Sequence, residues 1–187
     1  MPHERYTRYP VIAIEPCCNT VEWESFCHFI FTSRTAVQLL PKEVSLTGKT
    51  VIAVGKATAA ELTKLGVQAK IAQTETAEGV VELLSHMDLR DAKVLWPHSG
   101  QARSVISDYL SAQGVNYSEC VLYNVVFKHP GHLVNLDEFD EVLFTSPSTV
   151  QSFLEIFRKL PPLHKCRAIG PLTSSFLLCQ FQAFLTE

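Results

Sequence analysis

The sequence of 187 residues lacks the patterns that define several large classes of protein. No apolar stretch approaches the roughly 20 residues that a membrane-spanning helix needs. The run Val11-Ile12-Ala13-Ile14 is too short for the apolar part of a secretory signal. Lysine and arginine form no cluster and the net charge is −3, which argues against nucleic acid as the main partner. We therefore expect a globular protein with a cytoplasmic location.

The common signatures of nucleotide and metal sites are also missing. The sequence has neither the glycine pattern GxGxxG nor a Walker phosphate loop. Its six cysteines include no CxxC pair, and Cys17, Cys18, Cys27 and His28 match no usual zinc spacing. We therefore expect a chain with reduced thiols that binds neither a metal nor a nucleotide.

No arrangement of acid, base and nucleophile is apparent in the sequence. Ser33 and Ser146 have no neighbouring histidine and do not lie in a nucleophile elbow. His98 is interpreted as a loop histidine next to a turn. Arg103 is equally compatible with a carboxylate partner and with a solvated surface position. Tyr123 comes late in an apolar strand, where packing in the core is the simpler interpretation.

What the sequence does contain is an internal repeat. The segment Phe31-Thr32-Ser33-Arg34-Thr35-Ala36-Val37-Gln38 recurs as Phe144-Thr145-Ser146-Pro147-Ser148-Thr149-Val150-Gln151 with five identical positions of eight. Ala53-Val54-Gly55-Lys56-Ala57-Thr58-Ala59 recurs as Ala168-Ile169-Gly170-Pro171-Leu172-Thr173-Ser174. The offsets are 113 and 115 residues. Two motifs recurring in order at nearly one offset indicate two copies of a supersecondary unit.

Apolar runs alternate with helical patterns along the chain. We expect strands over residues 9–15, 26–31, 50–54, 67–72, 93–96, 117–127, 141–144 and 165–169. We expect helices over residues 35–40, 57–65, 77–87, 101–113, 148–160 and 172–184, with Gly66 and Gly114 ending two of them. This alternation predicts parallel sheets, and the continuous apolar run of residues 26–31 predicts a strand buried on both faces.

Small polar residues follow the predicted strands, at five junctions between a strand and a helix. These are Thr32-Ser33, Gly55 to Thr58, Ser99-Gly100, Thr145-Ser146 and Gly170 to Thr173. Helix N-termini offer unpaired N–H groups and partial positive charge, so they bind carboxylates or phosphates without lysine or arginine. Serine and threonine also cap helices, and for each residue alone capping is the simpler explanation. The duplication favours a shared site for a polyanion.

In these residues the chain resembles the uroporphyrinogen-III synthase family, over most of its length and in the family's order. The motifs are Phe31-Thr32-Ser33, Val54-Gly55-Lys56-Ala57-Thr58-Ala59, Gly100 to Arg103, Val121-Leu122-Tyr123, Phe144-Thr145-Ser146-Pro147 and Ile169-Gly170-Pro171-Leu172-Thr173. The resemblance implies an α/β fold of two parallel-sheet lobes, Rossmann-like or flavodoxin-like, joined by a two-strand connector. Residues 1–16 and 123–187 would form a discontinuous domain with the connector, and residues 17–122 the inserted domain.

The resemblance also implies a function. Members of the family cyclise hydroxymethylbilane without a cofactor in tetrapyrrole (heme) biosynthesis, with loss of water and inversion of the last pyrrole through a spiro intermediate. The substrate lies between the lobes, and its eight carboxylates suit many neutral donors. Tyr123 would help the terminal hydroxyl depart. The residues expected to bind substrate are Thr32, Ser33, Gly55, Lys56, Thr58, Ser99, Gly100, Arg103, Thr145, Ser146, Gly170 and Thr173.

The chain departs from the family pattern at its ends. It begins almost at the connector, without the family's first strand and helix, and it stops before the family's last strand and helix. We therefore expect a truncated discontinuous lobe with only two or three strands, whose open edges favour a homodimer or leave this half poorly packed. An alternative function follows, in which a weakly active or inactive relative only binds a polycarboxylate or tetrapyrrole. A Rossmann-like nucleotide binder is disfavoured by the missing glycine pattern.

Overall fold

The structure is a computed structural model that describes residues 6–18 and 20–184. The described residues divide into two compact units. One comprises those of Met1–Ile14 and Val125–Glu187, and the other is Glu15–Asn124. The expected domain bounds lie within two residues of this division and stay a prediction. In the described part of the chain, no helix has both the length and the apolar character that a membrane-spanning segment needs.

The larger unit contains a sheet of five parallel strands in the order β4-β3-β2-β5-β6. The strands are β2 (His28–Phe31), β3 (Thr50–Ala53), β4 (Lys70–Ile71), β5 (Lys93–Ser99) and β6 (Asn116–Phe127). In this order the chain moves outward from β2 to β4, then returns to the other side of β2 with β5. The sheet therefore has a topological switch point between β2 and β5, the place where α/β sheets of this kind bind ligands.

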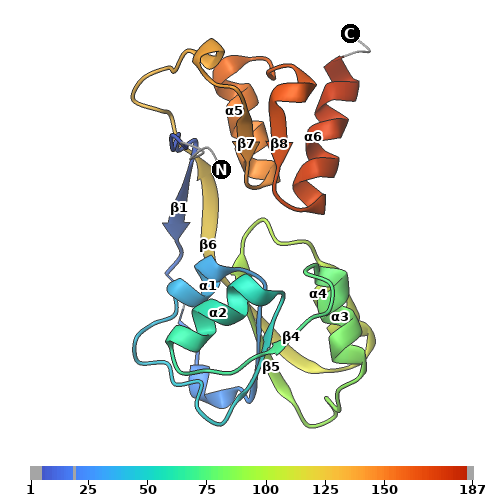
Figure 1. Cartoon of the computed structure of the whole chain (residues 1–187). Helices are drawn as coiled ribbons and strands as arrows, with labels where there is room; N and C mark the ends of the chain where they lie inside the picture. Colours follow the sequence, from blue (N-terminus) through green and yellow to red (C-terminus); the bar gives the residue numbers. More distant parts are fainter. Residues whose placement is uncertain (1–5, 19, 185–187) are drawn as a thin grey trace, which may run out of the picture. The chain divides into compact units, whose positions relative to one another are not determined.

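Four helices cover the two faces of this sheet. They are α1 (Arg34–Gln38), α2 (Lys56–Lys64), α3 (Ala77–Ser85) and α4 (Val105–Ala112). Helices α1 and α2 pack together on one face and α3 and α4 on the other (Figure 1). Gly66 and Gly114 follow α2 and α4 with φ of 74° and 65°, the left-handed region where glycine avoids a Cβ clash. The predicted ends of both helices are confirmed.

The core of the larger unit lies on both faces of β2. Phe29 and Phe31 point to one face and are fully buried, while Ile30 packs on the other face among residues of α3 and α4. Burying one such side chain stabilises a fold by roughly 1.5–3 kcal/mol. The sequence prediction of a strand buried on both faces is confirmed.

Strand β5 and helix α4 differ from the expected elements. The strand was expected to end at Trp96, before a turn from Pro97 to Gly100, and the helix was expected to begin at Gln101. Instead β5 continues to Ser99 and α4 begins at Val105. Pairing of β5 with β2 ends at Leu95, so beyond this residue β5 pairs only with β6. Pro97 is tolerated because its missing donor faces the side without a paired strand.

Strand β1 (Ile12–Pro16) pairs with β6 at the edge of the sheet. Lys128 N donates to Val11 O at 2.9 Å and Cys17 N donates to Leu122 O at 2.8 Å. The residue numbers of these partners run in opposite directions, so β1 and β6 are antiparallel. Both strands carry the chain across the division between the units, and the predicted two-strand connector is confirmed.

The smaller unit contains a parallel sheet of β7 (Val142–Phe144) and β8 (Cys166–Ala168). Helix α5 (Pro147–Phe157) follows β7, and α6 (Pro171–Phe184) follows β8 and packs against α5 (Figure 1). Phe144, Val150, Phe153 and Leu177 are the buried centre of this unit. Short 3-10 helices occur at Trp23–Ser25, Leu136–Glu138 and Leu163–Lys165. The second, small parallel sheet agrees with the expected fold class.

Candidate functional site

The repeated serines cap helices in the same way in both units. The Ser33 Oγ accepts a hydrogen bond from Ala36 N at 3.0 Å at the start of α1. The Ser146 Oγ accepts one from Thr149 N at 3.3 Å at the start of α5, and the Thr149 hydroxyl accepts from Ser146 N at 3.2 Å. Each serine satisfies N–H groups that the first turn of a helix leaves unpaired. The capping explanation of these serines is therefore correct.

The duplication extends to the strands beside these caps. Phe31 O accepts a hydrogen bond from Val54 N at 2.9 Å, and Phe144 O accepts one from Ile169 N at 2.8 Å. The residue after each donor is a glycine, Gly55 or Gly170, that leads into a helix. Each copy thus places a serine cap and a glycine at the carboxyl ends of two adjacent parallel strands, and the predicted repeat of a strand-helix unit is confirmed.

The carboxyl ends of β2 and β5 are joined by side chains where their backbone pairing has stopped. The backbones pair only at His28 with Val94 and Phe29 with Leu95. Beyond this point the Trp96 Nε1 donates a weak hydrogen bond to the Thr32 Oγ1 at 3.4 Å. Thr32 keeps its own hydroxyl hydrogen for another acceptor, because here it acts only as an acceptor.

A second contact at this end of the sheet links the two hydroxyls of Ser33 and Tyr123. Their oxygens lie 2.9 Å apart, and either group can donate. The Tyr123 side chain is 5% exposed, so it is largely shielded from water. Because the Ser33 Oγ also accepts the Ala36 N–H, Ser33 can use its single hydrogen toward Tyr123. In that arrangement the Tyr123 O–H remains available as a donor.

His98 is not the loop histidine that the sequence indicated. It lies in β5, is 7% exposed, and its ring centroid is 4.3 Å from that of Trp96. The Nδ1 contacts Ser99 O at 2.8 Å, and since a carbonyl only accepts, Nδ1 carries the hydrogen. Its Nε2 is buried and has no hydrogen-bond partner among the described residues. The only sequence signal for this residue was its place before the Ser99-Gly100 turn.

Ser99, Gly100 and Arg103 do not lie at the start of a helix as expected. Ser99 ends β5, its Oγ accepts a hydrogen bond from Gln101 N at 3.2 Å, and α4 begins only at Val105. Arg103 donates to both carboxylate oxygens of Glu78 at 2.7 and 3.1 Å. This hydrogen bonding lowers the pKa of Glu78 to about 2. Arg103 therefore has a carboxylate partner, one of the two interpretations that the sequence left open.

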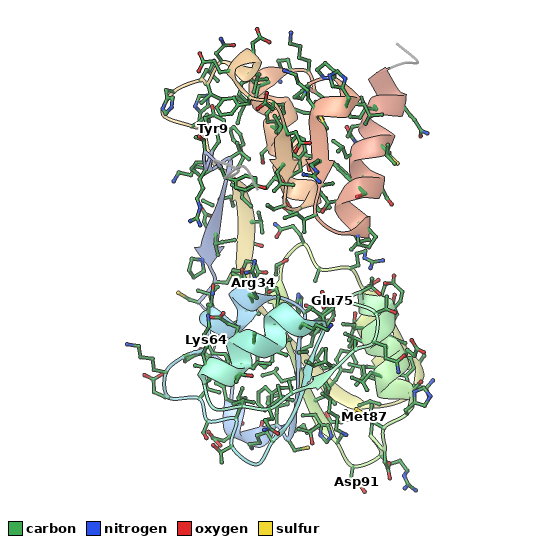
Figure 2. The ribbon with its side chains drawn as sticks, in the orientation of Figure 1. Tyr9, Arg34, Lys64, Glu75, Met87 and Asp91 are labelled. Carbon is green, nitrogen blue, oxygen red and sulfur yellow. The ribbon has the colours of Figure 1, made fainter. Side chains whose placement is uncertain are left out.

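A carboxylate of the chain itself lies at the N-terminus of α2. The Glu75 Oε1 accepts a hydrogen bond from Lys56 N at 2.9 Å. Figure 2 shows Glu75, which lies in the loop before α3, near one end of α2, and Lys64, the last residue of α2, near the other end. A Cβ built on Gly55 would meet the Cδ of Glu75 at 2.4 Å, so the glycine gives this side chain its space. The first N–H group of α2 is therefore engaged by a carboxylate of the chain itself, and the binding of a substrate at this junction stays a prediction.

The remaining predicted residues are two buried threonines, an exposed threonine and a glycine. Thr58 and Thr173 occupy the third positions of α2 and α6, and each is 3% exposed. Thr145 is exposed after β7, and Gly170 has φ of 79° before α6. The larger unit thus brings Thr32, Ser33 and Ser99 to the carboxyl ends of β2 and β5, beside Tyr123 within β6. The roles of all these residues in binding stay predictions.

A hollow of about 710 Å³ lies elsewhere on the larger unit. It is lined by the end of α1, the loop of residues 39–47 and the C-terminal half of α2. None of the predicted site residues lines it. The hydroxyl contacts at the switch point, and not this hollow, are therefore the candidate site.

Comparison with known proteins gives a consistent result. The family model described as "Uroporphyrinogen-III synthase HemD" matches residues 5–182. The crystal structure of uroporphyrinogen-III synthetase from Helicobacter pylori is similar with a TM-score of 0.66 and 20% identity, over 95% of this chain and 85% of that one. A mutant uroporphyrinogen III synthase from Thermus thermophilus is similar with a TM-score of 0.54 and 15% identity, over 96% of this chain and 89% of that one. No curated protein matches the chain. The structural likenesses show a shared fold.

Proposed function

The chain belongs to the uroporphyrinogen-III synthase family, and from this premise we propose that it cyclises hydroxymethylbilane to uroporphyrinogen III. The terminal hydroxyl of the substrate takes up a proton and leaves as water, and the pyrrole that carried it loses its N–H proton, giving an azafulvene. The last pyrrole then attacks, and a spiro intermediate inverts that ring before the macrocycle closes. The overall reaction is a cyclising loss of water, which places the protein among lyases of porphyrin biosynthesis.

The observation that carries the proposal is the hydroxyl pair of Ser33 and Tyr123. When Ser33 donates to Tyr123, the tyrosine O–H is the free donor, and the hydrogen bond that it makes is strengthened because its oxygen already accepts one. A hydroxyl leaving as water needs such a donor as a general acid. Tyr123 is largely shielded from water, which strengthens a hydrogen bond to the leaving group.

The scarcity of strong acid and base groups is compatible with this reaction. Hydroxymethylbilane is intrinsically reactive, so a protein accelerates type III formation mainly by holding the chain of pyrroles in one geometry. Backbone N–H groups and hydroxyls suit that task because they bind carboxylates without a fixed charge partner. We propose that Thr32 and Ser99 contribute such donors in the larger unit, where the Ser33 hydroxyl instead donates to Tyr123, and that Thr145, Ser146 and Gly170 contribute them in the smaller one.

The remaining parts of the proposal concern cofactor, location and assembly. We propose that the reaction needs no cofactor, that the protein is cytoplasmic, and that the smaller unit forms a homodimer. The last proposal is supported by its two-stranded sheet and by the exposure of Leu143, Ile169 and Leu178, which are 41%, 55% and 50% accessible. Light scattering that shows a stable monomer at micromolar concentration would contradict the dimer.

The decisive test of the function is an isomer assay. Freshly prepared hydroxymethylbilane is incubated with the protein, the products are oxidised to porphyrins, and the type I and type III isomers are separated. Spontaneous closure gives type I, and heat-denatured protein serves as the matched control. Type III above this control supports the proposal. Only type I, with retention of the bilane or its product by the protein, would instead support a binding protein without catalysis.

A further inference from the structure

The pairing of β5 with β6 contains an irregularity at its carboxyl end. His98 lies opposite Val121, but the next residue, Ser99, lies opposite Tyr123. Leu122 is therefore an extra residue on β6, which makes the irregularity a β-bulge. Since side chains of a strand alternate between the two faces, one extra residue moves every following side chain to the other face.

The bulge decides which face of the sheet Tyr123 occupies. Trp96 packs among residues of α3 and α4, and the His98 ring packs against it at an interplanar angle of 31°, so both lie on that face. Val121 lies opposite His98 and shares its face. Regular alternation would put Tyr123 on this face as well. The bulge places it opposite Ser99 instead, on the face of α1, where its hydroxyl reaches the Ser33 cap.

Two hydrogen bonds fix the backbone at the bulge, one from the turn after β5 and one from a side chain of β5. Gly100 N donates to Tyr123 O at 2.9 Å, and the His98 Nδ1–H donates to Ser99 O at 2.8 Å. A Cβ at Gly100 would collide with the Asn124 Oδ1, so the Asn124 side chain would have to move to admit a larger residue. The φ of Gly100 is not positive, so a larger residue would meet crowding by the Asn124 side chain and not backbone strain.

We infer that this bulge orients the Tyr123 side chain toward Ser33, and that His98 is a positioning residue of the reaction. The effect of His98 on the reaction rests on the proposed function, whereas the orientation of Tyr123 by the bulge does not. His98 acts through Nδ1, which fixes the carbonyl of Ser99 opposite Tyr123. The His98 ring is buried although its Nε2 has no partner among the described residues. This indicates that the Nδ1 contact, and not a contact of Nε2, is the structural role of the ring.

The first test separates the two nitrogens of His98. The side-chain nitrogen of His98→Asn takes the place of Nδ1 and keeps the donor to Ser99 O, whereas His98→Gln places its amide nearer Nε2 and loses that donor. Each variant is labelled with tyrosine that carries 13C at Cζ, and the Tyr123 signal is assigned with Tyr123→Phe among the five tyrosines. Ser33→Ala supplies the signal of a Tyr123 without its partner. The kcat and KM for type III formation are measured in parallel.

We expect the Tyr123 signal of His98→Gln to move toward that of Ser33→Ala, with kcat lowered about three- to tenfold and KM nearly unchanged. His98→Asn should keep the wild-type signal and kcat. An unmoved signal in His98→Gln, or an equal shift in both variants, would overturn the inference. Wild-type protein that yields only type I isomer, while the signals move as expected, would overturn the proposed function and support the positioning of Tyr123.

A second test uses the crowding at Gly100. Gly100→Ala should shift the Tyr123 signal, because the new Cβ meets the Asn124 amide. The double variant Gly100→Ala with Asn124→Ala should restore it, since the next neighbour of that Cβ is the Val121 Cγ1 at 3.5 Å, an ordinary contact. Asn124→Ala alone is the control. Failure of the double variant to restore the signal in a protein that still unfolds cooperatively would contradict the role of the bulge.

Discussion

The side-chain oxygens of Ser33 and Tyr123 lie 2.9 Å apart, although 90 positions separate the two residues in the sequence. Ser33 follows β2 and caps α1, while Tyr123 lies in β6, two strands away in the sheet. The contact spans the carboxyl end of β5, where the bulge opposite Ser99 turns Tyr123 toward α1. One hydroxyl that is anchored by a helix cap thus orients a second that is shielded from water.

We predict that Tyr123→Phe slows type III formation more than any single serine or threonine change. Loss of a general acid should lower kcat by at least about tenfold, which is below the usual effect of about 10²- to 10⁴-fold because the substrate is reactive. Ser33→Ala should cost less in rate, but should lower the free energy of unfolding by about 1 kcal/mol through loss of the N-cap.

Tyr117→Phe provides the matched control for this prediction. The Tyr117 hydroxyl lies 2.8 Å from the Ser111 Oγ, so this variant also loses a tyrosine-serine contact, but in the exposed surroundings of α4. Its rate should equal that of wild type. A Tyr123→Phe protein with an unchanged rate would remove Tyr123 from the mechanism.

We predict that Glu75 competes with the substrate for the N-terminus of α2. If Gly55 and Lys56 bind a substrate carboxylate, Glu75→Ala should lower KM a few-fold, because the Lys56 N–H is no longer engaged, and should leave kcat unchanged. The first turn of α2 also loses its anion, which should lower the free energy of unfolding by about 0.3–1 kcal/mol.

Glu82→Ala, which removes an exposed carboxylate on α3, is the control for nonspecific charge effects on a substrate with many carboxylates. The two variants have the same net charge. An equal KM for both would show that the N-terminus of α2 does not bind substrate.

Most of the fold was predictable because its signals are local. The buried strand around Phe29, the glycines after α2 and α4, and the serine caps all follow from patterns within a few residues. The repeat added the parallel pairing of β2 with β3 and of β7 with β8. These features depend on periodicity and capping, which a single sequence displays directly.

The geometry of the candidate site was less predictable because it depends on contacts between distant segments. Pro97 indicates the end of a strand, and only the loss of pairing with β2 after Leu95 explains why β5 continues. The extra residue Leu122 leaves no mark in the apolar pattern of β6. The carboxylate of Glu75 accepts a hydrogen bond from the backbone N–H of Lys56, 19 positions away, and no local motif indicates this contact.

We predict a pH-dependent contribution of the ion pair between Glu78 and Arg103. Hydrogen bonds from Arg103 lower the pKa of Glu78 to about 2 in the folded protein, from an ordinary value of 4.5. A lowered carboxylate pKa stabilises the fold above the pKa of the unfolded chain, and this contribution is lost as the pH falls toward about 2. Since both groups are exposed, it should be only about 0.5–1 kcal/mol at pH 7.

Thermal unfolding of wild type and Glu78→Gln at pH 7, 4 and 3 measures this contribution. The difference in stability should be largest at pH 7 and should shrink at each lower pH. Glu82→Gln, on the same helix, should show no such trend. A difference between wild type and Glu78→Gln that does not change with pH would mean that the pair does not form in solution.

We predict that Cys166 resists alkylation in the folded protein. Burial raises the pKa of its thiol to about 11, and its Sγ donates to Pro161 O at 3.4 Å. At pH 8 only about one thiol in a thousand is then the reactive thiolate. Cys18 and Cys179 are exposed and should react first with iodoacetamide, followed over time by mass spectrometry of the peptides.

The same experiment in urea distinguishes burial from intrinsic chemistry. Once the smaller unit unfolds, Cys166 loses its surroundings in β8, and its rate should rise at least about 100-fold, because its thiol regains an ordinary pKa near 8.5. Cys166→Ser identifies its peptide. Cys179 lies on α6 of the same unit and is the exposed reference. If Cys166 in the native protein reacts as fast as Cys179, then β8 is open to the reagent and the Cys166 thiol is not buried in solution.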